Sequence, residues 1–212
     1  RRRVLAALGA ELVLTPAADG MAGAVRKAQE LLAEAPQHFY LPDQFSNPSN
    51  PLIHERTTGP EIWTQTDGKV SAVVAAAGTG GTVVGTGRYF RSIGSKVQMV
   101  AVEPAESPLL AQRKAGLPCV SGPHGIQGIG ANFVPKVIDF SAIDRIEPVS
   151  TQEAMETARR LSREEGILSG ISSGAAVAAA LRLAAEDAYA NQVIVAILPD
   201  SGERYLSTAL FA

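Results

Sequence analysis

Five consecutive residues, Gly78-Thr79-Gly80-Gly81-Thr82, join an apolar run to a segment that can continue as a helix. The apolar run Val70–Ala77 is typical of a buried strand, and the helix is expected over Val83–Phe90. Such a turn directs several backbone N–H groups, and the positive end of the helix dipole, toward one point. The hydroxyls of Thr79 and Thr82 can add two donors. The turn therefore predicts an anion site, best suited to a phosphate.

Neither common nucleotide fingerprint fits this turn. The dinucleotide pattern G-x-G-x-x-G fails because Val83 stands where the third glycine belongs. The nucleotide P-loop fails because Thr86 follows Gly85 where a lysine is required. A phosphate cradle without either fingerprint indicates a single phosphate monoester, such as a phosphorylated cofactor. The alternative is a tight turn that binds no ligand.

Strand and helix patterns alternate along the chain. Helices are expected at 1–8, 23–34, 53–65, 83–90 and 109–113, after the capping box Ser150–Glu153 as far as Gly166, and from the turn Ser169–Gly174 to about Ala188. Strands are expected at Glu11–Leu14, Phe39–Leu41, Val70–Ala77, Lys96–Glu103, Ile143–Val149 and Gln192–Leu198. This order predicts an α/β fold with a doubly wound, mostly parallel sheet.

Ligands of such sheets bind beyond the C-terminal ends of the strands. Two turns, Gly78–Thr82 and Pro199–Arg204, directly follow predicted strands and are therefore expected there. Two other stretches are expected to be irregular: Gln44–Pro51, because of its Asn-Pro pairs, and the loop 104–136, which holds many of the glycines and prolines. A loop of that length is uncommon unless it is functional.

Charge and composition exclude several classes of function. The net charge of −2 gives no general attraction to nucleic acid, and no apolar run reaches membrane-spanning length. The single cysteine, Cys119, cannot form an internal disulfide, which fits a reducing compartment. The three histidines have no metal-ligand spacing. Because Arg1 falls inside a predicted helix, we expect an N-terminal portion to precede these residues.

Six stretches, in order along nearly all 212 residues, together resemble the cysteine synthases, or O-acetylserine sulfhydrylases. They are Gln44–Pro51, Thr57–Trp63, Gly78–Thr82, Gln127–Ala131, Gly170–Ala175 and Pro199–Tyr205. This family belongs to the pyridoxal-phosphate enzymes with the tryptophan-synthase β-subunit fold, fold type II. The resemblance implies that residues 1–45 end a small N-terminal domain with its crossover, and that 46–212 form the large cofactor-binding domain.

The resemblance also implies roles for single residues. Gly78, Thr79, Gly80, Gly81 and Thr82 would hold the phosphate of pyridoxal 5'-phosphate. Ser201 would bind the pyridine nitrogen, and Asp200 would face away from the ring. Gln44 would bind the substrate carboxylate through its amide, and Gly128 would belong to a glycine-rich wall beside the substrate.

The implied reaction is a β-replacement, in which sulfide takes the place of the acetate of O-acetylserine and cysteine forms. A lysine that first binds the cofactor and then acts as a base is required. None of the five lysines stands in that family motif, and the family's Thr-Ser-Gly-Asn-Thr-Gly loop is absent as well. We therefore expect residues 1–212 alone to bind the cofactor weakly and to catalyse nothing.

Two other interpretations stay open. The chain could belong to another enzyme of the same fold, such as cystathionine β-synthase or serine/threonine dehydratase. It could also be a non-catalytic module that binds serine acetyltransferase, a partner that the resemblance implies. A cytoplasmic homodimer is the implied setting, with neither nucleic acid nor membrane as a partner.

Overall fold

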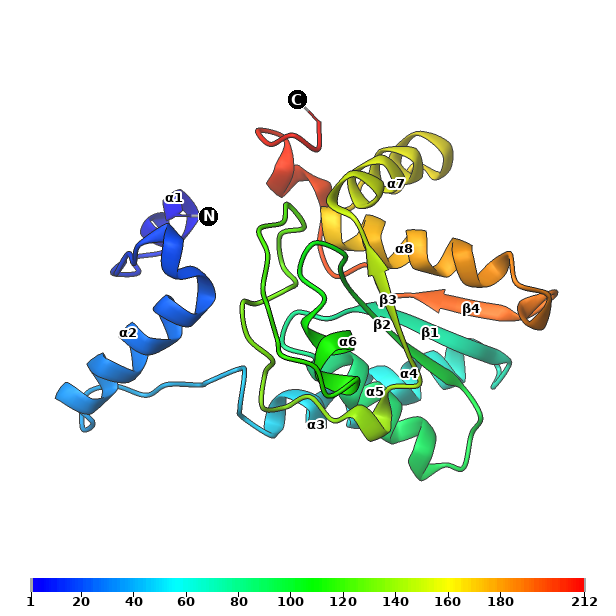
Figure 1. Ribbon diagram of the computed structural model, residues 1–212, viewed down its shortest axis with the longest axis horizontal. Helices are drawn as coiled ribbons and strands as arrows, with labels where there is room; N and C mark the ends of the chain where they lie inside the picture. The colour runs from blue at the N-terminus through cyan, green and yellow to red at the C-terminus, as the bar shows by residue number, and fades with distance from the viewer. Residues whose placement is uncertain (1, 212) are drawn as a thin grey trace. The chain divides into compact units, whose positions relative to one another are not determined.

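The computed structural model describes residues 2–211, and the chain divides into two compact units, Arg1–Asp43 and Gln44–Ala212. The first unit holds α1 (Arg2–Ala7), a short 3-10 turn and α2 (Gly20–Glu34), drawn in blue in Figure 1. Both helices were expected, although Arg1 lies outside the described residues. The assignment of residues 1–45 to a small domain stays a prediction.

Two predicted strands are wrong. Glu11–Leu14 and Phe39–Leu41 are irregular, although both contain apolar residues. A strand needs a neighbour for its backbone groups, and the described part of this unit contains no strand that could pair with either segment. Apolar composition alone therefore does not produce a strand here.

The second unit is built on a four-stranded parallel sheet of order β3-β2-β1-β4. In the centre, Val74 of β1 pairs with Val100 of β2 and with Ala196 of β4. The α/β fold with a parallel sheet is thereby confirmed. The strands are β1 (Val70–Ala76), β2 (Gln98–Pro104), β3 (Arg145–Val149) and β4 (Val193–Ala196).

Helices cover both faces of this sheet (Figure 1). On one face, Ala72 and Val74 of β1 belong to the core formed with α7 (Thr151–Glu165) and α8 (Ile171–Ala184). On the other, Val73 and Ala75 belong to the core formed with α5 (Gly81–Ser92) and α4 (Thr58–Gln65). Burial on both faces explains why β1 is an unbroken apolar run and does not alternate with polar residues.

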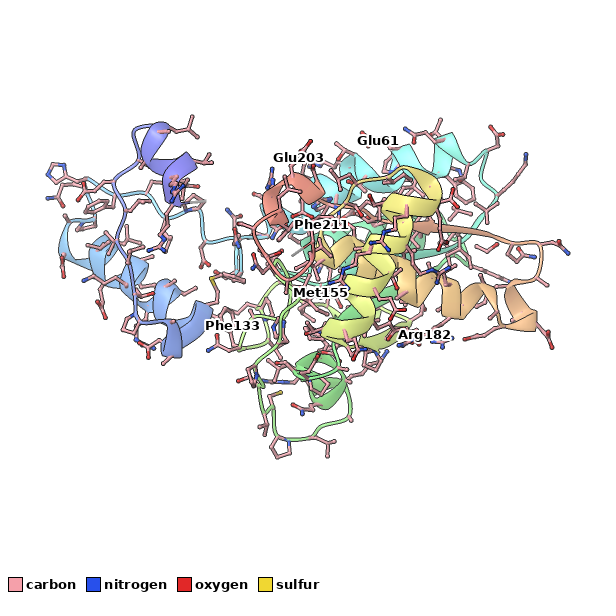
Figure 2. All side chains as sticks on the ribbon, turned by 90° about the horizontal axis from the view of Figure 1, so that it is seen from above. Glu61, Phe133, Met155, Arg182, Glu203 and Phe211 are labelled. Carbon is pink, nitrogen blue, oxygen red and sulfur yellow. The ribbon has the colours of Figure 1, made fainter. Side chains whose placement is uncertain are left out.

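The C-terminal residues complete the core on the α7 and α8 face. Tyr205 and Leu210 are fully buried there, and the partly buried side chains of Met155 and Phe211 pack against the same cluster. Figure 2 labels both of these side chains, together with Arg182 of α8, which forms an ion pair with Glu153 of α7. The segment that follows β4 is thus anchored to the sheet by burial.

The helices found in residues 44–65 begin and end at other positions than expected. The stretch Gln44–Pro51 was expected to be irregular, but α3 (Ser49–Arg56) begins inside it. The helix expected at 53–65 is divided, because the chain bends at Thr57 and α4 starts at Thr58. Pro51 lies in the first turn of α3 and Pro60 in the first turn of α4, where the missing N–H costs no intrahelical hydrogen bond.

Other local signals are confirmed. The Ser150 hydroxyl accepts a hydrogen bond from the Glu153 N–H at 3.2 Å, and α7 ends at Gly166 in the left-handed region. The loop 104–136 is irregular apart from α6 (Leu109–Lys114). No helix among residues 2–211 is long and apolar enough to cross a membrane.

The strand order places a switch point between β1 and β4. From β1 the chain passes through α5 to β2 and then to β3, always moving the same way across the sheet. It then returns through α7 and α8, on the opposite face, to β4 on the free side of β1. The connections leaving β1 and entering β4 therefore lie on opposite faces, which opens a crevice at the strand ends.

Candidate functional site

A cavity of about 260 Å³ lies at the C-terminal ends of β1 and β4. One wall comes from the turn after β1 and the first turn of α5, and another from Pro199 and Asp200 after β4. Gly128, Ile129 and Ser172 close it from the long loop and the start of α8. Residues from four separate parts of the chain therefore converge on the switch point of the sheet.

The first turn of α5 supplies unused backbone donors. Its N-cap, Gly80, has a φ of 87° and offers no side chain to the helix start. The N–H groups of Thr82 and Val83 consequently have no acceptor within the helix, and both residues line the cavity. These donors and the dipole of a twelve-residue helix make this wall attractive to an anion.

The Thr79 hydroxyl can act only as a donor toward the cavity. Its oxygen accepts hydrogen bonds from Asn50 Nδ2 at 2.9 Å and from the Gly81 N–H at 3.2 Å. Because a hydroxyl oxygen has two lone pairs, both are then in use. Only the O–H remains, and Thr79 belongs to the cavity wall.

A histidine stands behind the second threonine. His54 of α3 has Nε2 3.2 Å from the Thr82 hydroxyl and Nδ1 2.9 Å from the Thr58 hydroxyl. Burial lowers the pKa of His54, which keeps its ring neutral near pH 7. A neutral ring has one donor nitrogen and one acceptor nitrogen, so it can link the two hydroxyls in a directed chain.

The long loop 104–136 closely approaches the turn Gly78–Thr82, which we call the phosphate turn after its predicted ligand. A Cβ atom on Gly78 would lie 2.6 Å from the carbonyl oxygen of Gly128, so only glycine fits there. The Gly130 N–H donates to the Ala77 carbonyl at 3.3 Å. Gly128 thus lies in the cavity wall, and its place beside a substrate stays a prediction.

The wall that follows β4 is held by a buried tyrosine. The Tyr205 hydroxyl donates to Asp200 Oδ2 at 2.5 Å, and the Asp200 carbonyl accepts from the Gly170 N–H at 3.1 Å. Asp200 was expected to face away from the ring, yet it contributes to the cavity wall. Its Oδ1 atom is buried and has no hydrogen-bond partner among the described residues.

Five of the eight predicted site residues line this cavity, and three do not. Gly81 begins α5 just behind the wall. Ser201 instead donates to Glu203 Oε2 at 2.5 Å and caps a 3-10 turn, one residue beyond Asp200. Gln44 is exposed, and its carbonyl accepts from Asn50. The five in the wall are Gly78, Thr79, Gly80, Thr82 and Gly128. The binding roles of all eight stay predictions.

Sequence reasoning did not identify Asn50 and His54 as part of this site. Asn50 lies in the predicted polar stretch, where nothing local marks it as reaching Thr79. His54 and Thr58 are four residues apart, which places them near each other where two helices meet. Their proximity to the phosphate turn arises because α3 packs against α5, which sequence spacing does not reveal.

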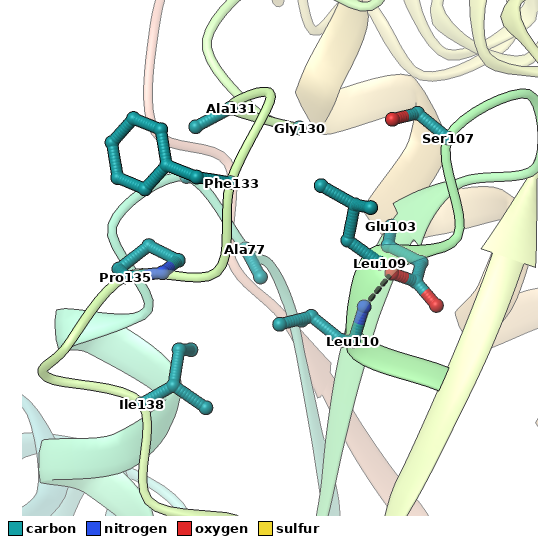
Figure 3. A pocket seen from close by; sticks show the side chains of 11 residues that line it. Ala77, Glu103, Ser107, Leu109, Leu110, Gly130, Ala131, Phe133, Pro135 and Ile138 are labelled. Carbon is teal, nitrogen blue, oxygen red and sulfur yellow. Dashed lines mark hydrogen bonds between the residues drawn. The ribbon is translucent and has the colours of Figure 1, made fainter. Parts of the chain in front are cut away.

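A much smaller cavity, about 20 Å³, adjoins the phosphate turn (Figure 3). Its wall includes Glu103, which is 2% exposed and accepts hydrogen bonds from the Leu110 N–H at 2.7 Å and the Ala111 N–H at 2.9 Å. Burial raises the pKa of Glu103 despite these two bonds. This cavity is large enough for about one water molecule, and Glu103 anchors α6 to the end of β2.

Comparisons with known proteins agree on one family. Residues 1–200 match the family described as pyridoxal-phosphate dependent enzymes. The chain is 56% identical to cysteine synthase A of Escherichia coli (strain K12) over 214 aligned residues, covering all of this chain and 66% of that protein. It thus spans just under two thirds of the length of that relative.

Solved structures give the same picture. Cysteine synthase from Entamoeba histolytica is 41% identical with a TM-score of 0.91, covering 99% of this chain and 60% of that one. The O-acetylserine dependent cystathionine beta-synthase from Helicobacter pylori is 36% identical with a TM-score of 0.85, covering all of this chain and 66% of that one. Both resemblances extend over the sheet and the cavity described above.

Proposed function

Because this chain belongs to the family of pyridoxal-phosphate-dependent enzymes, we propose that it forms the cofactor-binding part of a cysteine synthase. The proposed reaction replaces the acetate of O-acetylserine with sulfide and yields cysteine. The observation that carries the proposal is the convergence of the Thr79 and Thr82 hydroxyls with the free amides of α5 at the switch point of the sheet. Similarity to cysteine synthases supports the choice of reaction.

The donor set fits a phosphate monoester. Such a group presents three acceptor oxygens and up to two negative charges. The cavity wall offers two helix amides and a hydroxyl that can only donate, and it contains no carboxylate besides Asp200 on the β4 side. Binding by amides and hydroxyls needs no lysine or arginine.

When bound, the cofactor supplies the electron-withdrawing ring that makes substitution at the β-carbon possible. In our proposal, the residues Gly78–Thr82 hold the phosphate, and the Ser201 hydroxyl gives up its hydrogen bond to Glu203 to face the ring nitrogen. A serine hydroxyl does not keep that nitrogen protonated, so the ring withdraws electrons more weakly than it would beside a carboxylate. Gln44 would orient the substrate carboxylate through its amide, and Gly128 would leave room for the substrate.

The proton-transferring lysine is assigned to residues outside 1–212. None of the five lysines in this sequence belongs to the described cavity wall. Within residues 2–211, no three histidine, cysteine or acidic side chains are placed together so that they could hold a metal ion. In our proposal this chain therefore binds and orients, and a lysine from elsewhere in the whole protein moves the proton.

The test uses residues 1–212 alone. We expect them to bind pyridoxal 5'-phosphate in competition with inorganic phosphate, measured by fluorescence titration, and to form no cysteine from O-acetylserine and sulfide. Cysteine formation by residues 1–212 would contradict the placement of the lysine. Cofactor binding that inorganic phosphate does not weaken would contradict the phosphate cradle.

A second enzyme activity has one specific observation in its favour, the similarity to the O-acetylserine dependent cystathionine beta-synthase. Assays of the whole protein with O-acetylserine and either sulfide or homocysteine distinguish the two reactions.

We further propose a cytoplasmic homodimer that docks serine acetyltransferase, in keeping with the resemblance. Sedimentation tests the homodimer, and co-purification tests the complex with serine acetyltransferase. If the whole protein were a non-catalytic binding module, it would co-purify with the acetyltransferase but show no enzyme activity.

A further inference from the structure

We propose that Asn50 is a positioning residue, which sets the direction of the Thr79 hydroxyl and ties the Gln44 segment to the phosphate turn. This inference rests on the proposed function, because it concerns the same phosphate. Asn50 is the second residue of α3 and is partly buried. Its side chain contacts two separate loops, one at Gln44 and one at Thr79.

The orientation of the Asn50 amide follows from its partners. One side-chain atom lies 2.7 Å from the carbonyl oxygen of Gln44, which can only accept a hydrogen bond. That atom must therefore be the amide nitrogen, Nδ2. Its second hydrogen is directed at the Thr79 hydroxyl oxygen, 2.9 Å away. Both hydrogens of the amide are then in use, and the amide has no alternative flipped state.

The amide is also held against the helix start. A Cβ atom on Gly81 would overlap with Asn50 Oδ1, so the side chain rests directly on the first turn of α5. The Gly81 N–H occupies the remaining lone pair of the Thr79 oxygen at 3.2 Å. With both lone pairs filled, the Thr79 proton has to point to a third partner, and we place the phosphate there.

The substitution Asn50→Asp tests this arrangement because it changes the chemistry and almost nothing in shape. A carboxylate oxygen in place of Nδ2 repels the Gln44 carbonyl and attracts the Thr79 proton. The hydroxyl then turns away from the phosphate, and a negative charge stands behind it. The matched control is Asn47→Asp, which adds the same charge three residues earlier and keeps the Oδ1 acceptor for the Ser49 N–H.

The measurement compares two ligands on residues 1–212 by calorimetry, pyridoxine 5'-phosphate and pyridoxine. They differ only in the phosphate, and neither carries an aldehyde that reacts with lysines. We expect Asn50→Asp to weaken binding of the ester about tenfold or more, the value of one hydrogen bond to a charged group. We expect pyridoxine affinity to change less than about twofold. Asn47→Asp should leave both affinities unchanged.

Thermal unfolding checks that each variant folds. Should Asn50→Asp fail to fold, Asn50→Leu removes both donors without adding a charge and is compared in the same way. In a Thr79→Val background, which lacks the hydroxyl, Asn50→Leu should cost no further ester affinity. Equal losses for ester and pyridoxine, or an undiminished loss in that background, would overturn the role of Asn50. A wild-type chain that does not prefer the ester would instead refute the phosphate cradle itself.

Discussion

The imidazole of His54 links two threonine hydroxyls, with Nε2 3.2 Å from Thr82 and Nδ1 2.9 Å from Thr58. Thr82 belongs to α5 and lines the cavity, whereas His54 and Thr58 lie on the helices that pack behind it. If Nε2 donates to the Thr82 oxygen, the Thr82 proton is available to a ligand. In the neutral ring that burial favours, Nδ1 then accepts the O–H of Thr58, so the position of the single ring proton sets the direction of both hydrogen bonds.

The pH dependence of stability should report on this histidine. Burial lowers the pKa of His54 below its usual 6.5, so the unfolded chain binds the proton more readily than the folded chain. The stability that the neutral ring provides is present above pH 6.5 and is lost as the pH falls below it. We expect the free energy of unfolding, measured in urea from pH 7.5 to 5, to fall less in His54→Gln than in the wild type.

His38 provides the control for that comparison, because it is exposed on the other compact unit. The His38→Gln variant should follow the wild-type pH profile. Identical profiles for His54→Gln and the wild type would contradict a buried neutral ring at position 54.

The hydrogen bond from Tyr205 to Asp200 should contribute strongly to stability. Tyr205 is fully buried and donates to Asp200 Oδ2, while Asp200 Oδ1 is buried without a partner among the described residues. Tyr205→Phe should therefore lower the free energy of unfolding by about 1–3 kcal/mol, the cost of an unsatisfied buried polar group.

Tyr189→Phe is the matched control for the tyrosine. Tyr189 also packs against the core, but its hydroxyl forms no hydrogen bond among the described residues. Removal of the Tyr189 hydroxyl should change the free energy of unfolding by less than about 0.5 kcal/mol. Similar values for both variants in urea unfolding would show that the Asp200 contact is not special.

Glu103 should give a pH dependence of the opposite sign. Burial raises its pKa above 4.5, so the folded chain binds the proton more tightly than the unfolded chain. The contribution of Glu103 to stability therefore declines as the pH rises from 4.5 through the folded-state pKa. As the pH rises through this range, the wild type should therefore lose free energy of unfolding relative to Glu103→Gln.

The surface residue Glu61, labelled in Figure 2, is the control for this measurement, because its side chain is exposed on α4. The difference between the wild type and Glu61→Gln should stay constant with pH. A constant difference for Glu103→Gln as well would mean that its carboxylate titrates as it does in the unfolded chain.

Local patterns predicted most of the second unit. The capping box at Ser150, the left-handed Gly166 and the apolar strand Val70–Ala76 act through neighbours in sequence, and each was found where expected. Segments whose structure depends on distant partners were predicted less well. Glu11–Leu14 is irregular because no strand pairs with it, and the helix that begins at Ser49 packs against α5.

The sequence by itself determined that a strand, a glycine-threonine turn and a helix follow one another, and this order alone aims the amides of Thr82 and Val83 at one point. Only the tertiary structure decided that β4 lies beside β1, which brings Asp200 to the same cavity. It also decided that Asn50 and His54 stand behind the two threonines. The physical reason is that turn chemistry acts between adjacent residues, whereas strand order and helix packing arise from burial of side chains far apart in the chain.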